Sequence, residues 1–355
     1  MSRFDKIAAL LDRQQLDAIL ITSEPNRLYA TGFSSSAGAA VITRSNHYFI
    51  TDSRYIEAAS KKIDGCQILE NTRTAPVLTL VENILQEHKV QRLGYEDERT
   101  TVREYQALSQ KLSAQLVPAS DLLTEVRTAK DQQEIDTLIT AQRIAEKALT
   151  EVLSFIRPGR TEKEVAAFLQ YQMLLGGAEK MSFDPIVVAG PNSSLPHGVP
   201  TDRPLADGDF LTMDFGCIYN GYCSDMTRTV AIGHVTEEME RVYNTVLQAQ
   251  LAGIAKVRPN VPGKIIHNAA AQVIADAGYG EYFRHGFGHG LGIELHEMPG
   301  AGGNSETPLP VGTVLSAEPG IYLPDRFGVR IEDVIVITES GCMNITKAPK
   351  ALLVL

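Results

Sequence analysis

GDFLTMDFG (208–216) recurs later in the chain as GTVLSAEPG (312–320), and these two stretches decide the fold. Each begins with a glycine and continues through mostly apolar residues, as buried β-strands do. Each then reaches an acidic residue, Asp214 or Glu318, six positions after the glycine. The match predicts that the second part of the chain contains two copies of one structural unit.

The residues upstream of each stretch are repeated as well. IRPGRTEKEVAAFLQYQMLLGGAEK (156–180) and VRPNVPGKIIHNAAAQVIADAGYGE (257–281) both show an Arg-Pro turn, an amphipathic helix and a glycine-containing stop. In the first copy, Thr161 and Glu164 have the spacing of a capping box, which marks the start of a helix. Each copy is therefore expected to contain a helix followed by β-strands.

A second acidic residue follows the strand of the first copy, and turn geometry should bring the two acids together. Asn220-Gly221 is the preferred dipeptide for a two-residue hairpin turn, because both residues take positive φ. Counting back from this turn puts Gly216 opposite Asp225. Since side chains alternate between the faces of a sheet, Asp214 and Asp225 should be diagonal neighbours on one face.

The second copy carries Glu318 and a later acid, Glu332. We expect PDRFG (324–328) to form a five-residue loop, which would place Gly320 opposite Glu332. That register would make Glu318 and Glu332 diagonal neighbours too. Two different turns would then give the same arrangement of acids.

Four carboxylates on neighbouring strands repel one another unless cations lie between them. Arginine or lysine could supply that charge, but a matched set of acids with an imidazole is more typical of two divalent cations. The imidazole is expected from RHGFGHGLGIELHEMPG (284–300), which holds three histidines and glycines at alternate positions. Oxygen ligands with a single nitrogen suit Mn²⁺, Co²⁺, Fe²⁺ or Zn²⁺, and the glycines would let backbone approach the metals closely.

The first third of the chain alternates strand-like and helix-like patterns and is expected to be a small α/β domain. The strands are expected at 17–22, 39–43, 47–51, 91–96 and 114–119, and a helix at 55–63. From 121 to 156 the apolar residues keep helical spacing until RPGR stops them. We place the domain boundary near residue 124, giving domains at 1–124 and 125–355.

The composition of the chain limits the kinds of partner and the cellular compartment that we expect. The 355 residues carry a net charge of -10, which is the opposite of the basic footprint of nucleic-acid-binding proteins and disfavours anionic membrane surfaces. The four cysteines form no CxxC pair, no apolar run has the length of a membrane span, and the N-terminus lacks the pattern of a signal peptide. We expect a cytoplasmic protein with free cysteines.

The ordered motifs MDFG, CSDMTRT, GFGHGLG, SAEPGIY and RIEDVIVIT resemble those of the pita-bread metallopeptidases, in the branch that holds prolidase and Xaa-Pro aminopeptidase. The resemblance covers nearly the whole chain. It implies an N-terminal creatinase-like α/β domain, for dimerisation and substrate access, followed by a C-terminal pseudo-two-fold pita-bread domain, an α/β (α+β) fold. It also implies a homodimer and proline-containing peptides as substrates.

The resemblance implies two divalent metal ions per subunit, with Mn²⁺ expected first and Co²⁺ or Zn²⁺ as alternatives. The implied metal ligands are Asp214, Asp225, His289, Glu318 and Glu332, with Asp225 and Glu332 bridging the ions. Water activated by the metals would be the nucleophile.

Three residues have implied catalytic roles. Glu318 would shuttle a proton to the leaving amine, and His197 and His296 would contact the scissile carbonyl and the following peptide. We expect His285, by contrast, to be a structural histidine with no direct role.

Other residues have less certain roles. Arg54 and Tyr55 are candidates to assist a neighbouring active site, on analogy alone, and Phe183 would either line the substrate pocket or belong to the core. Cys217 and Cys223 are expected to be small core residues.

The implied reaction is hydrolysis of the bond between an N-terminal residue and a following proline. Many relatives carry HExPR where this chain has HEMPG, so Gly300 replaces an arginine that is suited to an anionic substrate group. The loss of that charge favours an Xaa-Pro aminopeptidase, which acts on longer peptides, over a prolidase, which acts on dipeptides. Methionine aminopeptidase-like activity and a non-enzymatic pita-bread peptide-binding protein are further alternatives, disfavoured by the N-terminal domain and by the complete ligand set.

Overall fold

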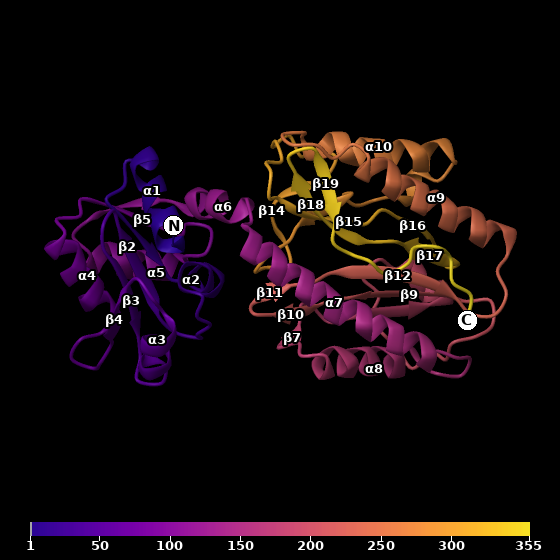
Figure 1. Cartoon of the computed structure of the whole chain (residues 1–355), viewed down its shortest axis with the longest axis horizontal. Helices are drawn as coiled ribbons and strands as arrows, with labels where there is room; N and C mark the ends of the chain where they lie inside the picture. The colour runs from indigo at the N-terminus through magenta and orange to yellow at the C-terminus, as the bar shows by residue number, and fades with distance from the viewer. Residues whose placement is uncertain (1) are drawn as a thin grey trace. The chain divides into compact units, whose positions relative to one another are not determined.

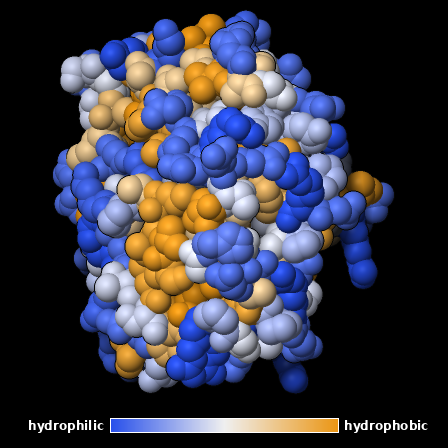
Figure 2. Space-filling view, turned by 90° about the vertical axis from the view of Figure 1, so that its right-hand side faces the viewer, coloured by the Kyte–Doolittle hydropathy of each residue, from blue (hydrophilic) through white to orange (hydrophobic). Residues whose placement is uncertain are grey.

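The computed structural model describes residues 2–355, and the chain divides into two compact units, one ending at Arg127 and the other comprising Thr128–Leu355. Within the described residues, no helix is long and apolar enough to cross a membrane. One face of the molecule shows an apolar patch bordered by hydrophilic residues (Figure 2).

The first unit is built on a six-stranded sheet of order β4-β3-β2-β1-β5-β6 (Figure 1). Strands β1, β2 and β3 pair antiparallel, whereas β4, β5 and β6 pair parallel to their neighbours. The strands are β1 (Ala18–Ile21), β2 (Ala39–Thr43), β3 (His47–Thr51), β4 (Gln67–Glu70), β5 (Arg92–Tyr95) and β6 (Gln115–Pro118). The helices are α1 (Arg3–Leu11), α2 (Glu24–Thr31), α3 (Ile56–Lys62), α4 (Val77–Glu87), α5 (Val102–Lys111) and α6 (Ser120–Thr128), with a 3-10 turn η1 (Asp12–Gln14).

The predicted α/β character of this unit is confirmed. Strand β4 was missed, because its four residues QILE contain only two apolar side chains and are not fully buried. The predicted helical stretch 121–156 was wrong in one respect, since two helices, α6 and α7 (Gln132–Phe155), replace it. Asp131 caps the second helix and forms a capping box with Glu134, a signal that the helical spacing concealed.

The second unit contains two similar halves, as the repeat predicted. In the first half, α7 and α8 (Glu162–Leu175) pack on the sheet β12-β9-β8 and share one buried core with it. The capping box of Thr161 and Glu164 at the start of α8 is confirmed. The strands are β7 (Lys180–Met181), β8 (Ile186–Ala189), β9 (Phe210–Phe215), β10 (Cys217–Tyr219), β11 (Tyr222–Cys223) and β12 (Met226–Ala231), with a 3-10 turn η2 (Gly190–Ser194).

In the second half, α9 (Glu237–Ile254) and α10 (Gly263–Asp276) share another buried core with the sheet β14-β13-β15-β18-β19 and the hairpin β16-β17. Figure 1 shows these helices on one side of the strands of this unit and α8 on the other. The strands are β13 (Gly288–Gly290), β14 (Glu297–Ala301), β15 (Val314–Ala317), β16 (Gly320–Leu323), β17 (Phe327–Arg330), β18 (Asp333–Thr338) and β19 (Gly341–Asn344), with a 3-10 turn η3 (Gly280–Tyr282). The pseudo-two-fold second unit predicted from the sequence is confirmed.

Candidate metal centre

The first hairpin has the register that its turn predicts. Asn220 and Gly221 have φ of 46° and 77°, and Tyr219 pairs with Tyr222. The ladder is interrupted at Ser224 and Asp225 and resumes with Met226 opposite Phe215, which puts Thr227 opposite Asp214. The count across the interruption places Gly216 beside the Ser224–Asp225 segment, where a Cβ on Gly216 would lie 1.9 Å from the Ser224 carbonyl oxygen.

The second hairpin contradicts its predicted register. Leu323 pairs with Phe327 and Gly320 pairs with Arg330, so the loop has three residues instead of five. The cause is Asp325, whose φ of 57° follows a proline as in a type II turn. Because Ala317 also pairs with Asp333, Glu318 and Glu332 face one another directly across a gap in the ladder.

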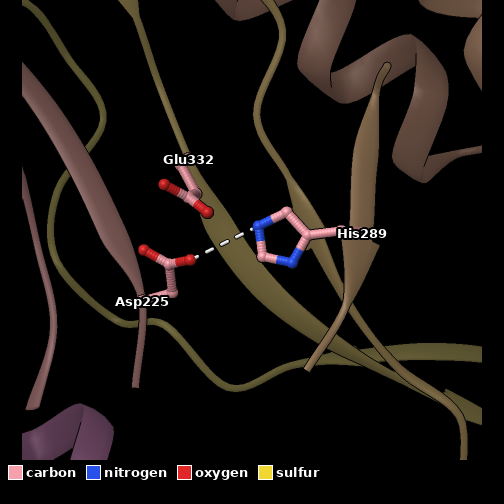
Figure 3. A group of neighbouring side chains, drawn as sticks. All are labelled: Asp225, His289 and Glu332. Carbon is pink, nitrogen blue, oxygen red and sulfur yellow. Dashed lines mark ion pairs between the residues drawn. The ribbon is translucent and has the colours of Figure 1, made fainter. Parts of the chain in front are cut away.

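The acids and the imidazole nevertheless converge. Ligand atoms of Asp225, His289 and Glu332 all lie within 4.8 Å of one another, and Figure 3 shows both carboxylates beside the imidazole. His289 Nε2 lies 3.5 Å from Asp225 Oδ2 and 3.2 Å from Glu318 Oε1. Asp214, Glu318 and this cluster line one cavity of about 730 Å³.

The hydrogen bond of His289 fixes which of its nitrogens faces the acids. Nδ1 lies 3.0 Å from the Gly290 carbonyl oxygen, and because a carbonyl only accepts, Nδ1 carries the hydrogen. In the neutral ring, Nε2 then presents a lone pair to the carboxylates of Asp225 and Glu318, which is the tautomer that metal-binding histidines adopt.

The carboxylates carry more negative charge than their surroundings balance. Burial, followed by the charge of nearby carboxylates, raises the pKa of Asp225 and of Glu332 well above the ordinary values. Burial acts in the same direction on Glu318, but the hydrogen bond and charge of His289 in its protonated form, together with the charge of Arg330, outweigh it and lower the pKa of Glu318 to about 2. Such opposed shifts within one buried group of acids are typical of functional sites.

Three buried carboxylate oxygens show whether the residues of the site suit a bound cation. Asp214 Oδ1, Asp225 Oδ1 and Glu332 Oε1 are buried among the described residues without a hydrogen-bond partner. A buried ionised oxygen without a partner is costly, and a divalent cation coordinated by these oxygens would remove that cost. The residues present therefore fit divalent metal ions.

Arg330 is a part of the site that the sequence reasoning missed. Its guanidinium donates to Asp214 Oδ2 at 2.5 Å, to the Tyr322 hydroxyl at 2.8 Å and to Thr227 Oγ1 at 3.1 Å. The signal was present in RIED, because Arg330 precedes Glu332 by two residues, and side chains two residues apart in an extended segment share a face. A single guanidinium still leaves four carboxylates with an excess of negative charge.

The three remaining histidines predicted near the site all line the same cavity. His197 and His296 do so as expected, and the His296 ring lies 4.2 Å from that of His289 in an edge-to-face arrangement. His285 also lines the cavity, and its Nε2 lies 3.1 Å from the Tyr322 hydroxyl. The expectation of a structural histidine did not foresee this contact, through which His285 reaches the Arg330 network.

Two of the glycines at alternate positions of 286–292 lie where the backbones of neighbouring strands pack too closely for a side chain. A Cβ on Gly288 would lie 1.9 Å from the Ser316 carbonyl oxygen, and one on Gly290 would lie 2.3 Å from that of Glu297. These glycines let β13 pack closely between β14 and β15, which holds His289 in place.

The other residues considered from the sequence fall in several places. Phe183 lines the cavity. Cys217 and Cys223 are buried free thiols, as expected of small core residues. In the first unit, Arg54 pairs with Asp52 at 2.6 Å and lies over the ring of Tyr55.

Comparison with known proteins gives matches along almost the whole chain. Residues 136–339 match metallopeptidase family M24, and residues 3–129 match the creatinase/prolidase N-terminal domain. An uncharacterised peptidase of Bacillus subtilis is 42% identical over 354 residues, covering 99% of this chain and 100% of the relative.

Two solved structures are similar in fold and sequence. The Xaa-Pro dipeptidase from Bacillus anthracis has a TM-score of 0.95 and 40% identity, covering 99% of both chains. The X-Pro aminopeptidase from Thermotoga maritima has a TM-score of 0.92 and 35% identity, covering 97% of this chain and 99% of that one.

Proposed function

The chain belongs to metallopeptidase family M24, in the branch with a creatinase/prolidase N-terminal domain, and is a hydrolase; from this premise we propose that it is an Xaa-Pro aminopeptidase. It would release the N-terminal residue that precedes a proline, using two divalent metal ions. The observation that carries the proposal is the convergence of four carboxylates and one imidazole on a single cavity, with three carboxylate oxygens lacking a partner.

The proposed ligands divide into a shared pair and two outer groups. Asp225 and Glu332 would contact both ions, Asp214 one ion, and His289 with Glu318 the other. The oxygen-rich set suits Mn²⁺, with Co²⁺ or Zn²⁺ as alternatives. When bound, the ions would polarise the scissile carbonyl and lower the pKa of the attacking water.

The side chains themselves would manage the proton and the substrate. Glu318 receives a hydrogen bond from Ser316 Oγ at 2.8 Å, and its ionised carboxylate would accept a proton from the water and return it to the leaving nitrogen. The X-Pro nitrogen lacks a hydrogen and must be protonated to leave. His197 and His296, which line the cavity from two separate loops, would donate to the substrate carbonyl oxygens.

Two residues bear on substrate length. Gly300 replaces the arginine of the HExPR motif that many relatives carry, and the loss of a charge suited to a dipeptide carboxylate supports action on longer peptides. Arg284, however, lines the cavity and supports a second candidate, an Xaa-Pro dipeptidase, because its guanidinium could bind that carboxylate.

Product analysis by mass spectrometry separates the two candidates. Ala-Pro and Ala-Pro-Ala are incubated with the protein and Mn²⁺, with parallel samples in EDTA. Release of alanine from the tripeptide, abolished by EDTA, supports the aminopeptidase. Cleavage of the dipeptide alone identifies a dipeptidase, and cleavage of neither peptide by folded, metal-loaded protein contradicts the proposal.

The proposed setting is a cytoplasmic homodimer in which the N-terminal domain, 1–124, mediates dimerisation and substrate access to the catalytic domain, 125–355. The acidic composition supports a partner that is neither nucleic acid nor membrane. Size-exclusion chromatography with light scattering should give twice the mass of one chain, and removal of residues 1–124 should give a single chain.

A further inference from the structure

Glu162 is a buried carboxylate that the proposed reaction does not use. It lies at the first turn of α8 and is 0% exposed. Its Oε1 accepts from the Ala189 N–H at 2.7 Å and from Asn192 Nδ2 at 3.0 Å. Its Oε2 accepts from the Thr201 N–H at 2.9 Å and from Thr201 Oγ1 at 2.6 Å. Neutral donors thus satisfy both oxygens, aided by the positive end of the α8 dipole.

These donors lie on both sides of His197. Ala189 and Asn192 precede it and Thr201 follows it, so one carboxylate closes the base of the segment 189–201. Loops whose ends are held together in this way keep a compact shape.

Burial of the loop's own side chains does not hold its tip. Leu195 and Val199, the apolar residues on either side of His197, are 57% and 77% exposed. Two further ties run to the second half of the unit, where Ser193 Oγ accepts from the Gly328 N–H at 2.8 Å and Arg330 donates to the Pro196 carbonyl oxygen at 3.2 Å. At the base, the Lys163 N–H of α8 also donates to the Thr201 carbonyl oxygen at 3.2 Å. Polar contacts at the base and on one side therefore set the position of His197.

The repeat shows that the fold does not itself require an acid at this place. The residue of the second copy that corresponds to Glu162 is Gly263, at the start of α10. A Cβ there would lie 2.3 Å from the Gly300 carbonyl oxygen, so this helix start packs directly on β14. The first copy instead uses a carboxylate to hold a loop.

We propose that Glu162 is a positioning residue that holds His197 at the substrate-binding wall of the cavity. The catalytic part of this inference rests on the proposed function, in which His197 contacts the substrate, whereas the anchoring part rests on the contacts alone. A glutamine at 162 would turn an NH₂ group toward N–H or O–H donors and lose the contacts on one side.

The test combines kinetics with hydrogen exchange in the full-length protein. Glu162→Gln, His197→Ala and the double variant form a cycle on Ala-Pro-Ala with Mn²⁺. We expect Glu162→Gln to lower kcat/KM about tenfold when His197 is present and less than about twofold when it is absent. Equal losses in both backgrounds would overturn the catalytic part.

Exchange of backbone amides in metal-free protein tests the anchor without any activity. We expect faster exchange across 190–201 in Glu162→Gln, with no change across 210–231, and unchanged exchange across 190–201 would overturn the proposal. Glu164→Gln is the matched control, because it makes the same change in the same helix turn at an exposed capping residue. It should leave both readouts unaltered.

A second variant approaches the contact from the loop. Thr201→Val removes one donor to Glu162 while keeping the carboxylate, so it serves if Glu162→Gln does not fold. Thr201→Val should raise amide exchange across 190–201. Like Glu162→Gln, it should lower kcat/KM more when His197 is present than when His197 is replaced by alanine. If the wild-type protein cleaves no peptide, the proposed function fails, and the exchange measurements still decide whether Glu162 anchors the loop.

Discussion

The two halves of the second unit differ at the residue two positions before the second acid, which is Cys223 in the first half and Arg330 in the second. The Cys223 thiol is buried and lies 3.4 Å from the Ile293 carbonyl oxygen, whereas Arg330 crosses to Asp214 of the other half. Toward the proposed metal ions, the first half thus supplies only carboxylates, while the second adds a guanidinium and the imidazole of His289. The comparison teaches that the symmetry of the fold does not extend to its electrostatics.

The two hairpin turns differ as well. The first uses two residues with positive φ, and the second uses a proline followed by Asp325 with positive φ. One pair of acids is consequently diagonal and the other lies directly opposite. Similar sequences around the acids therefore do not guarantee equal registers, because the turn sets the register.

The largest effect is expected where the halves meet. Asp225→Asn and Glu332→Gln should each lower kcat/KM on Ala-Pro-Ala by about 10³-fold or more, because each removes a charge that would bind metal. Isothermal titration with Mn²⁺ should show weaker binding in both variants. Glu96→Gln, which alters a buried carboxylate of the first unit, should keep metal binding, and retained activity in both site variants would contradict the ligand assignment.

Arg330 and Cys223 should differ in how much their substitution by neutral polar residues lowers activity and stability. Arg330→Gln should reduce activity about 10- to 100-fold, since it removes the partner that orients Asp214. It should also destabilise the metal-free protein by about 3 kcal/mol, because a buried carboxylate loses its counter-charge. Cys223→Ser should change stability by about 1 kcal/mol or less; similar effects of the two changes on urea denaturation and kinetics would refute the asymmetry.

Gly216 and Gly320 occupy matched positions of the two halves, and substitutions there should differ less in their effect on stability. Gly216→Ala would drive a Cβ into the Ser224 backbone carbonyl, whereas Gly320→Ala would meet the Tyr322 hydroxyl at 2.5 Å. We expect losses of about 3 and about 1 kcal/mol in the free energy of unfolding, since backbone yields less readily than a side chain. Denaturation in urea with EDTA measures both losses. A larger loss for Gly320→Ala than for Gly216→Ala would show that the Tyr322 side chain is held more rigidly than the Ser224 backbone.

The smallest effect is expected at the turns. Gly221→Val should cost about 2 kcal/mol, because a β-branched residue is strained at a φ of 77°. Asp325→Gly should stay within about 0.5 kcal/mol, as relief of strain offsets the added freedom of the unfolded chain. Urea denaturation measures both changes in the free energy of unfolding. Equal losses would contradict the claim that the two turns differ in their dependence on a residue with positive φ.

Sequence patterns were sufficient for the two-unit α/β architecture, the repeat and the first hairpin, because Asn220-Gly221 specifies its turn without tertiary help. They failed at the second hairpin, where Gly328 was taken for a turn residue. Its glycine is needed for packing instead, since a Cβ would lie 2.1 Å from the Ser193 carbonyl oxygen. Such a contact joins distant segments and leaves no local signal.

The four acids and the imidazole expected at the site do line one cavity, because they follow recognisable motifs. Arg330 and Glu162 were missed for a different reason. Each looks like an ordinary charged residue of a strand or helix start, and only the fold shows that its side chain is buried and is held by residues from distant parts of the sequence.

The central claim is that the two unequal halves together bind a pair of divalent ions. The most direct measurement is the metal content per chain, by mass spectrometry of the elements, after loading with Mn²⁺ and removal of free metal. The account predicts two ions per wild-type chain and fewer in His289→Ala. Folded wild-type protein that retains none, or a single ion unaffected by His289→Ala, would contradict it.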